Sequence, residues 1–196
     1  VQMNRREEFD RLWKWTRTYM YIEDGPCKNY FAWSCATDGS KNAEGPAPDG
    51  EEYFAMALFF AANRWGNGTG IFHYADEARA ILRECIHKGE PGHPGEPMWD
   101  TSRHLIKFIT NCNFSDPSYH LPHFYELFAR WADEDDREFW RDAAEASRAY
   151  LHLACHPDTG LSAEYAEYDG TPHEGHQEIF GRHDWYYSDA YRTIAN

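Results

Sequence analysis

The stretch DGEEYFAMALFFAA, residues 49–62, decides the fold class. Its acidic beginning suits the N-terminus of a helix, where the helix dipole favours negative charge. The residues that follow are apolar on every side, as in a helix that is buried all round. Neither this run nor any other in the chain approaches the roughly 20 apolar residues that cross a bilayer. We therefore predict a buried helix that opens at Asp49.

The rest of the chain predicts further helices, and no β-alternation of useful length appears. Helical periodicity appears in five more segments: residues 5–21, 75–87, 119–131, 136–155 and a last one from about 188 to 196. In the first of them, Phe9, Leu12, Trp13 and Thr16 share one face. Buried helices thus alternate with half-exposed ones across loops rich in Gly and Pro. A toroid of helical hairpins gives this alternation, so we predict one all-α domain over residues 1–196.

The composition excludes some partners and suggests others. Lys and Arg number 19 and Asp and Glu number 33, and a net charge of −14 repels nucleic acids and anionic membranes. Aromatic residues make up 17% of the chain, and they either fill a large core or line a groove for sugars. We predict neither a nucleic-acid nor a membrane partner.

The cysteines predict free thiols. They number five, an odd count, and no Cys-x-x-Cys occurs, so neither a complete disulfide framework nor a zinc knuckle fits. Reduced thiols, together with first residues that lack the layout of a signal peptide, favour a cytoplasmic protein. A secreted protein is the alternative. No cofactor is predicted.

Three clusters combine carboxylates with aromatic rings where a loop meets a helix. In the first, Asp49 follows a rigid Gly-Pro-Ala-Pro turn and is either a plain N-cap or a functional carboxylate. In the second, residues 114–125, Asp116 accompanies His120 and His123, whose i, i+3 spacing lets both face one site. We interpret these side chains as the lining of a polar pocket. A metal would need a clear third ligand, so no metal site is predicted.

The third cluster surrounds Asp189, with Tyr187 before it and Arg192 three residues after it. An arginine at that spacing keeps a carboxylate ionised at neutral pH, although a surface ion pair on a capped helix has the same pattern. In a helical toroid the corresponding helix ends converge, so we expect all three clusters around one groove. Paired carboxylates in an aromatic groove suit glycoside hydrolysis, because one protonates the leaving oxygen while the other activates water.

Four motifs in and around these clusters resemble glycoside hydrolase family 8, above all its reducing-end xylose-releasing exo-oligoxylanases. They are YFAWSC (30–35), GPAPDGEEYFA (45–55), FSDPSYHLPHFYELF (114–128) and SDAYR (188–192). The resemblance implies an (α/α)6 barrel, here present in part, and inverting hydrolysis of β-1,4-xylosidic bonds in xylo-oligosaccharides with release of reducing-end xylose. The alternatives are an endo-acting family 8 xylanase, another β-glycanase such as a chitosanase or cellulase, and a non-catalytic fragment.

The resemblance also implies roles for five residues. Asp189 would be the general base that activates water, and Asp49 would hold the distorted sugar at the point of cleavage. Tyr119 would lie close to that sugar, Arg192 would orient Asp189, and Trp33 would be a stacking platform. Inversion requires roughly 6.5–9.5 Å between the acid and base carboxylates. Asp116, His120 and Tyr187 are predicted to contact substrate.

The sequence departs from the family pattern in three respects. The general acid of the family is a Glu in a Thr-Glu-Gly-type motif. This sequence contains no such motif, and residues 1–3 resemble those just after it. The chain therefore resembles the central part of a family 8 catalytic domain, and we expect it to be inactive by itself. The family residues that make the activity exo-acting lie beyond position 196. The loop 173–185 also diverges from the family.

Overall fold

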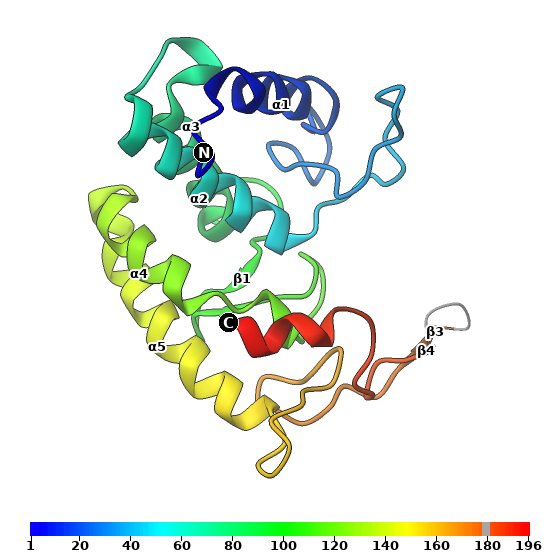
Figure 1. Cartoon of the computed structure of the whole chain (residues 1–196). Helices are drawn as coiled ribbons and strands as arrows, with labels where there is room; N and C mark the ends of the chain where they lie inside the picture. Colours follow the sequence, from blue (N-terminus) through cyan, green and yellow to red (C-terminus); the bar gives the residue numbers. More distant parts are fainter. Residues whose placement is uncertain (178–180) are drawn as a thin grey trace. The chain divides into compact units, whose positions relative to one another are not determined.

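The computed structural model describes residues 1–177 and 181–196, and these divide into two compact units. Unit 1 comprises residues 1–97 and 131–133, and unit 2 comprises residues 98–130 and 134–196. Helices dominate both units (Figure 1), which confirms the predicted all-α class. Within the described residues, no helix is both long enough and apolar enough to cross a membrane.

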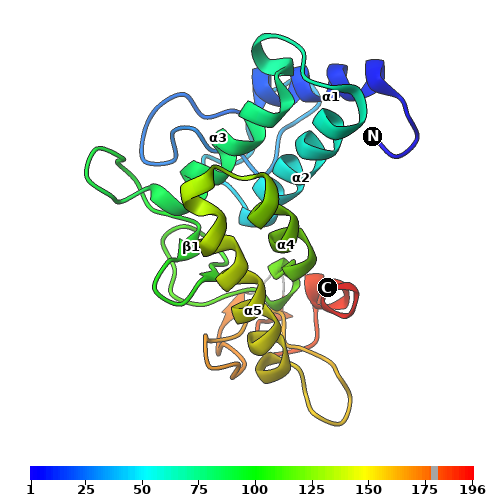
Figure 2. The ribbon, with the colours of Figure 1, turned by 90° about the vertical axis from the view of Figure 1, so that its left-hand side faces the viewer.

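Unit 1 is built on three helices. They are α1 (Arg6–Tyr19), α2 (Pro48–Trp65) and α3 (Tyr74–His87), with the short 3-10 helix η1 (Gly70–Phe72) before α3. Helices α2 and α3 lie side by side in both views (Figures 1 and 2). Helix α2 begins at Pro48, since proline suits the first turn of a helix, where a backbone N–H has no helical partner. Asp49 therefore lies inside the first turn, and the N-cap is Ala47.

Burial in unit 1 corrects the predicted apolar faces at two places. In α1, Trp13 and Thr16 are buried as predicted, but Leu12 is 69% exposed. In α2, Tyr53 is exposed, so the helix is not covered on every side. The side chains of Glu51 and Glu52 are nevertheless buried in its first turns, which the apolar pattern gave no reason to expect.

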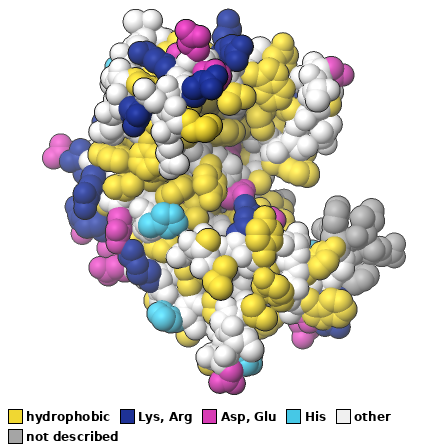
Figure 3. Space-filling model, in the orientation of Figure 1, with side chains coloured by type: hydrophobic (Ala, Val, Ile, Leu, Met, Phe, Trp, Pro, Cys, Tyr) yellow, Lys and Arg dark blue, Asp and Glu magenta, His cyan; other side chains and the backbone are white. Residues whose placement is uncertain are grey.

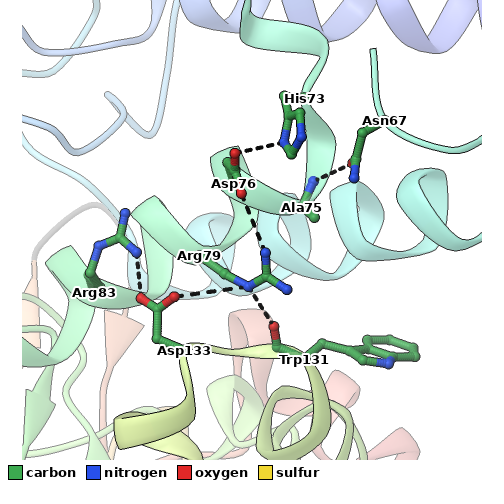
Figure 4. A network of polar contacts seen from close by, with 8 residues as sticks. All are labelled: Asn67, His73, Ala75, Asp76, Arg79, Arg83, Trp131 and Asp133. Atoms are coloured by element: carbon green, nitrogen blue, oxygen red, sulfur yellow. Dashed lines mark hydrogen bonds and ion pairs between the residues drawn. The ribbon is translucent and has the colours of Figure 1, made fainter. Parts of the chain in front are cut away.

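A polar network joins α3 to the segment 131–133, which belongs to unit 1 (Figure 4). The Nε atom of Arg79 donates to the carbonyl oxygen of Trp131 at 3.0 Å and lies 3.9 Å from a carboxylate oxygen of Asp133. Arg79 also pairs with Asp76 at 3.4 Å, and Arg83 pairs with Asp133. Exposed ion pairs contribute about 0–1 kcal/mol each, so this network fixes the position of the segment more than it adds stability.

Unit 2 combines two helices with short irregular elements. These elements are α4 (Pro122–Trp131), α5 (Arg137–Ala154), the 3-10 helices η2 (Pro117–Tyr119), η3 (Glu134–Asp136) and η4 (Ser188–Ala195), and the strands β1 (Trp99–Asp100), β2 (Leu105–Ile106), β3 (His176–Gln177) and β4 (Gly181–Arg182). The strands form two antiparallel pairs, β1 with β2 and β3 with β4. Helices α4 and α5 meet through the buried rings of Phe128 and Trp140, whose centroids are 5.1 Å apart.

The helix predicted over residues 119–131 begins later than the sequence indicated. Pro122 opens α4, and a proline disfavours helical geometry in the residue before it. The residue so restricted is Leu121, and His120 before it also has an extended backbone, between η2 and α4. His120 is buried while His123 is exposed, so the two rings do not share one face of a helix as predicted. The last predicted helix is the 3-10 helix η4. Residues 178–180 of the divergent loop lie outside the described residues.

Candidate active site

Unit 2 brings the second and third sequence clusters together. Element η2 packs against η4, and the Nδ2 atom of Asn196 donates to the carbonyl oxygen of Ser118 at 2.8 Å. The guanidinium carbon of Arg192 lies 5.6 Å from the centroid of the Tyr119 ring. A cation over an aromatic face is attracted by the negative potential of the ring. The structure thus places Tyr119 beside the Asp189–Arg192 pair, from segments about 70 residues apart along the chain.

Asp189 and Arg192 form the i, i+3 ion pair that the sequence predicted. The guanidinium Nη2 of Arg192 donates to Oδ2 of Asp189 at 2.7 Å. The Asp189 side chain is 44% exposed, so water reaches the carboxylate that the arginine orients. The preceding residue, Ser188, has a φ of 44°, a left-handed conformation that is uncommon outside glycine. Such backbone strain concentrates at functional sites.

Asp116 is a buried carboxyl group in the same neighbourhood. It accepts a hydrogen bond from the backbone N–H of Ser118 at 2.8 Å and so caps η2. Burial raises the pKa of Asp116 to about 8, with the hydrogen bonds from Ser118 and the charge of Arg192 opposing the shift and the charge of Asp189 adding to it. At neutral pH this carboxyl group therefore carries a proton for most of the time.

His120 supports the segment that carries Tyr119. The ring is fully buried, its Nε2 atom lies 2.9 Å from Oγ of Ser115, and its Nδ1 atom lies 2.9 Å from Oγ of Ser147 on α5. Burial lowers the pKa of His120 to about 3, so the ring is neutral. The contact with Ser147 ties the η2 segment to α5, and the contact with Ser115 holds the ring within its own segment. Contact between His120 and a substrate stays a prediction, which this burial does not favour.

Unit 1 carries the other two predicted site residues. Asp49 lies in the first turn of α2, and the Trp33 side chain is 64% exposed, which leaves its ring available for stacking. The Oε1 atom of buried Glu51 accepts a hydrogen bond from the backbone N–H of Phe31 at 2.8 Å. Burial raises the pKa of Glu51, and the charge of Asp49 adds to the shift. The sequence assigned Glu51 no role, because nothing in the sequence indicates that its carboxyl group meets the backbone of Phe31.

Exposed aromatic residues lead into Asp189, and hydrophobic side chains (yellow) reach the surface of unit 2 in Figure 3. Tyr187 belongs to this run, as do Trp185 and Tyr186. A cavity of about 500 Å³ in unit 2 is lined by other residues, including Pro122, Arg148 and Thr193. Of the side chains interpreted as pocket lining, His123 lines this cavity, whereas none of the residues with a predicted catalytic or substrate-binding role does. Within unit 2, Tyr187 and Asp189 are at least partly exposed, whereas Asp116, Tyr119 and His120 are buried.

The five cysteines carry free thiols. No group of three or more His, Cys, Asp or Glu side chains in residues 1–177 and 181–196 is arranged to hold a metal ion.

Comparisons with known proteins agree on one family. Residues 1–195 match the family model described as Glycosyl hydrolases family 8. The chain belongs to this family. It is 60% identical, over its whole length, to the reducing-end xylose-releasing exo-oligoxylanase Rex8A of Paenibacillus barcinonensis, of which it covers 51%. It is 58% identical to the exo-oligoxylanase of Halalkalibacterium halodurans, of which it covers 49%.

Solved structures give the same result. The structure of Rex8A from Paenibacillus barcinonensis complexed with xylose matches 99% of this chain and 51% of its own, with a TM-score of 0.94 at 60% identity. This likeness agrees with the predicted family fold, the (α/α)6 barrel present in part. The chain spans about half the length of the curated exo-oligoxylanases that it matches. More distant is Endoglucanase 2 of Ruminiclostridium josui, which is 29% identical over 98% of this chain and 38% of its own.

Proposed function

We propose that the full-length protein hydrolyses β-1,4-xylosidic bonds in xylo-oligosaccharides, with inversion, and releases xylose from the reducing end. The observation that carries the proposal is a contrast in identity. The chain is 60%, 58% and 57% identical to three reducing-end xylose-releasing exo-oligoxylanases, but 29%, 27% and 25% identical to three endoglucanases. Residues 1–196 would form the central part of a single catalytic domain.

Asp189 is the proposed general base. Its exposed carboxylate would accept a proton from a water molecule, and that water would attack the anomeric carbon from the face opposite the leaving oxygen. The ion pair with Arg192 would hold the carboxylate in one orientation during proton transfer. Tyr119, beneath the guanidinium of Arg192, would lie close to the same sugar. The proposed general acid is a Glu outside these 196 residues, in the motif that the family resemblance implies.

The remaining proposed roles concern the substrate. Asp49 would hold the sugar at the point of cleavage in a distorted ring shape, which brings it partway to the transition state. Trp33 would stack on a sugar face. Tyr187, with its exposed ring, is a further proposed substrate contact. Asp116 would support the site from inside the protein and would not touch the sugar, because its carboxyl group is buried and protonated at neutral pH.

The test is an assay of the full-length protein on xylotetraose that carries a ¹³C label in its reducing-end residue. The label is expected to appear in free xylose, and NMR is expected to show the new reducing end of xylotriose first as the α anomer. A label that stays in xylotriose or appears in xylobiose would contradict reducing-end release. Binding of xylotetraose without any hydrolysis would instead support a sugar-binding module.

A further inference from the structure

The buried carboxyl group of Glu51 has no place in the proposed reaction, yet it lies two residues after Asp49. Its Oε1 atom accepts a hydrogen bond from the backbone N–H of Phe31 at 2.8 Å. Phe31 precedes Trp33 by two residues in an extended segment. A side chain of α2 is thus attached to the backbone that presents the exposed Trp33 ring.

The direction of the backbone explains why this attachment needs a carboxyl group. Phe31 forms an antiparallel bridge with Tyr21, and the hydrogen bonds of that bridge are made by the neighbouring residues: Ala32 N–H donates to Met20 and Ile22 N–H donates to Tyr30. The N–H of Phe31 therefore points to the opposite side of the extended segment, where α2 begins. A buried N–H without an acceptor is costly, and the carboxyl oxygen of Glu51 supplies the acceptor.

Other contacts hold the same segment against α2. The ring of Phe31 packs on Phe54, with centroids 5.1 Å apart. The backbone N–H of Trp33 donates to the carbonyl oxygen of Gly45 at 3.1 Å, and Gly45 lies in the turn that leads into α2. Among these contacts, the one from Glu51 is the side-chain hydrogen bond that fixes the segment directly to the turn carrying Asp49.

We propose that Glu51 is a positioning residue for Trp33, the proposed sugar platform. Through the backbone of Phe31, it holds Trp33 in a fixed position relative to Asp49. The proposal rests on the proposed function, in which Trp33 stacks on a sugar of the xylo-oligosaccharide. Glu51 itself does not touch the sugar. Its loss would weaken substrate binding through the position of the platform, while the chemistry at Asp189 would continue once the substrate is bound.

The test is a double-mutant cycle in the full-length protein. Glu51→Met keeps the volume of the side chain and removes the acceptor, whereas Glu51→Gln keeps both and is the matched control. We expect Glu51→Met to raise KM for xylotetraose about tenfold with kcat within about twofold, and Glu51→Gln to remain near the wild-type KM. In a Trp33→Ala background, Glu51→Met is expected to have little further effect on KM, because coupled residues are not additive. Additive effects on KM, or a fall in kcat alone, would overturn the proposal.

A measurement on the wild-type protein guards against a variant that does not fold. The amide hydrogen of Phe31 is expected to exchange with solvent as slowly as amides in the middle of α2, because Glu51 holds it. Fast exchange at Phe31 would overturn the proposal. If the wild-type protein neither binds nor cleaves xylo-oligosaccharides, the proposed function fails, while the exchange at Phe31 still reports whether Glu51 holds this segment.

Discussion

The two carboxylates proposed to act on substrate are positioned in different ways. Asp49 lies in the first turn of α2, a long helix that packs along α3, so helical backbone hydrogen bonds place it. Asp189 lies near the start of η4, a 3-10 helix, directly after the left-handed residue Ser188. Side-chain contact with Arg192 orients it. The same pattern in the sequence, an aspartate where a loop meets a helix, thus places one carboxylate on a long α-helix and the other on a 3-10 helix, where Arg192 orients it.

This difference predicts which carboxylate tolerates changes around it. A helix turn keeps its geometry when one neighbouring side chain is replaced, because its hydrogen bonds are made by the backbone. An aspartate oriented by one ion pair loses its orientation when the partner is removed. The chemical step is therefore expected to be sensitive to Arg192 near Asp189 and less sensitive to single side-chain changes beside Asp49, while Glu51 acts on the segment that carries Trp33.

The largest expected effect is that of Asp189→Asn in the full-length protein. Removal of a general base lowers kcat by about 10²- to 10⁴-fold, while the fold, followed by circular dichroism, is expected to persist because the residue is partly exposed. Arg192→Met is expected to lower kcat to a smaller degree, since the carboxylate remains but is no longer oriented. Turnover near wild type in Asp189→Asn would show that another group is the base.

A smaller effect is expected from Asp49→Asn. If the Asp49 side chain holds the sugar in a distorted shape, its loss removes part of the binding energy, roughly 1–5 kcal/mol, that maintains the distortion. The kcat for xylotetraose is therefore expected to fall by about 10²-fold. Steady-state kinetics on both variants would check the order. An unchanged kcat in the Asp49→Asn variant would show that unit 1 takes no part in the chemical step and contributes only to sugar binding.

The smallest expected effect concerns stability and depends on the buried carboxyl group of Asp116, in contrast to the partly exposed Asp189. The pKa of Asp116 is raised by burial from an ordinary value of 3.8 to about 8, so the folded state holds this proton more tightly than the unfolded state does. The resulting stabilisation is complete below about pH 4 and is lost as the pH rises toward 8.

The Asp116→Asn variant cannot lose that proton, so its Tm is expected to fall less than the wild-type Tm between pH 5 and pH 8, by a few degrees. Thermal unfolding followed by circular dichroism would measure the difference. Parallel Tm curves for the two proteins would mean that Asp116 is ionised in the folded state and is balanced by Arg192.

Several features of the molecule could be predicted from short stretches of sequence. Periodicity predicted a helix over residues 75–87, and α3 buries Ala78, Ile81, Leu82 and Cys85 on one face. The Asp189–Arg192 pair also formed, because residues three apart on a helical segment face the same side. The four family motifs likewise lie within short segments, and the family to which they pointed is confirmed.

The errors fall where distant segments meet. His120 and His123 were expected on one helix face, but Pro122 delays α4, and His120 is buried between Ser115 and Ser147. Glu51 was expected only to suit a helix N-terminus, but its side chain is buried and accepts the N–H of Phe31, twenty residues earlier in the chain.

The sequence by itself determined the helical class, the family and the local ion pair, because periodicity and i, i+3 contacts depend on neighbours within a few residues. Only the tertiary structure decided which carboxyl groups are buried and which backbone N–H or hydroxyl group meets them. The physical reason is that the state of a titratable group depends on its desolvation and its partners, and in Glu51 and His120 these come from elements far away in the chain.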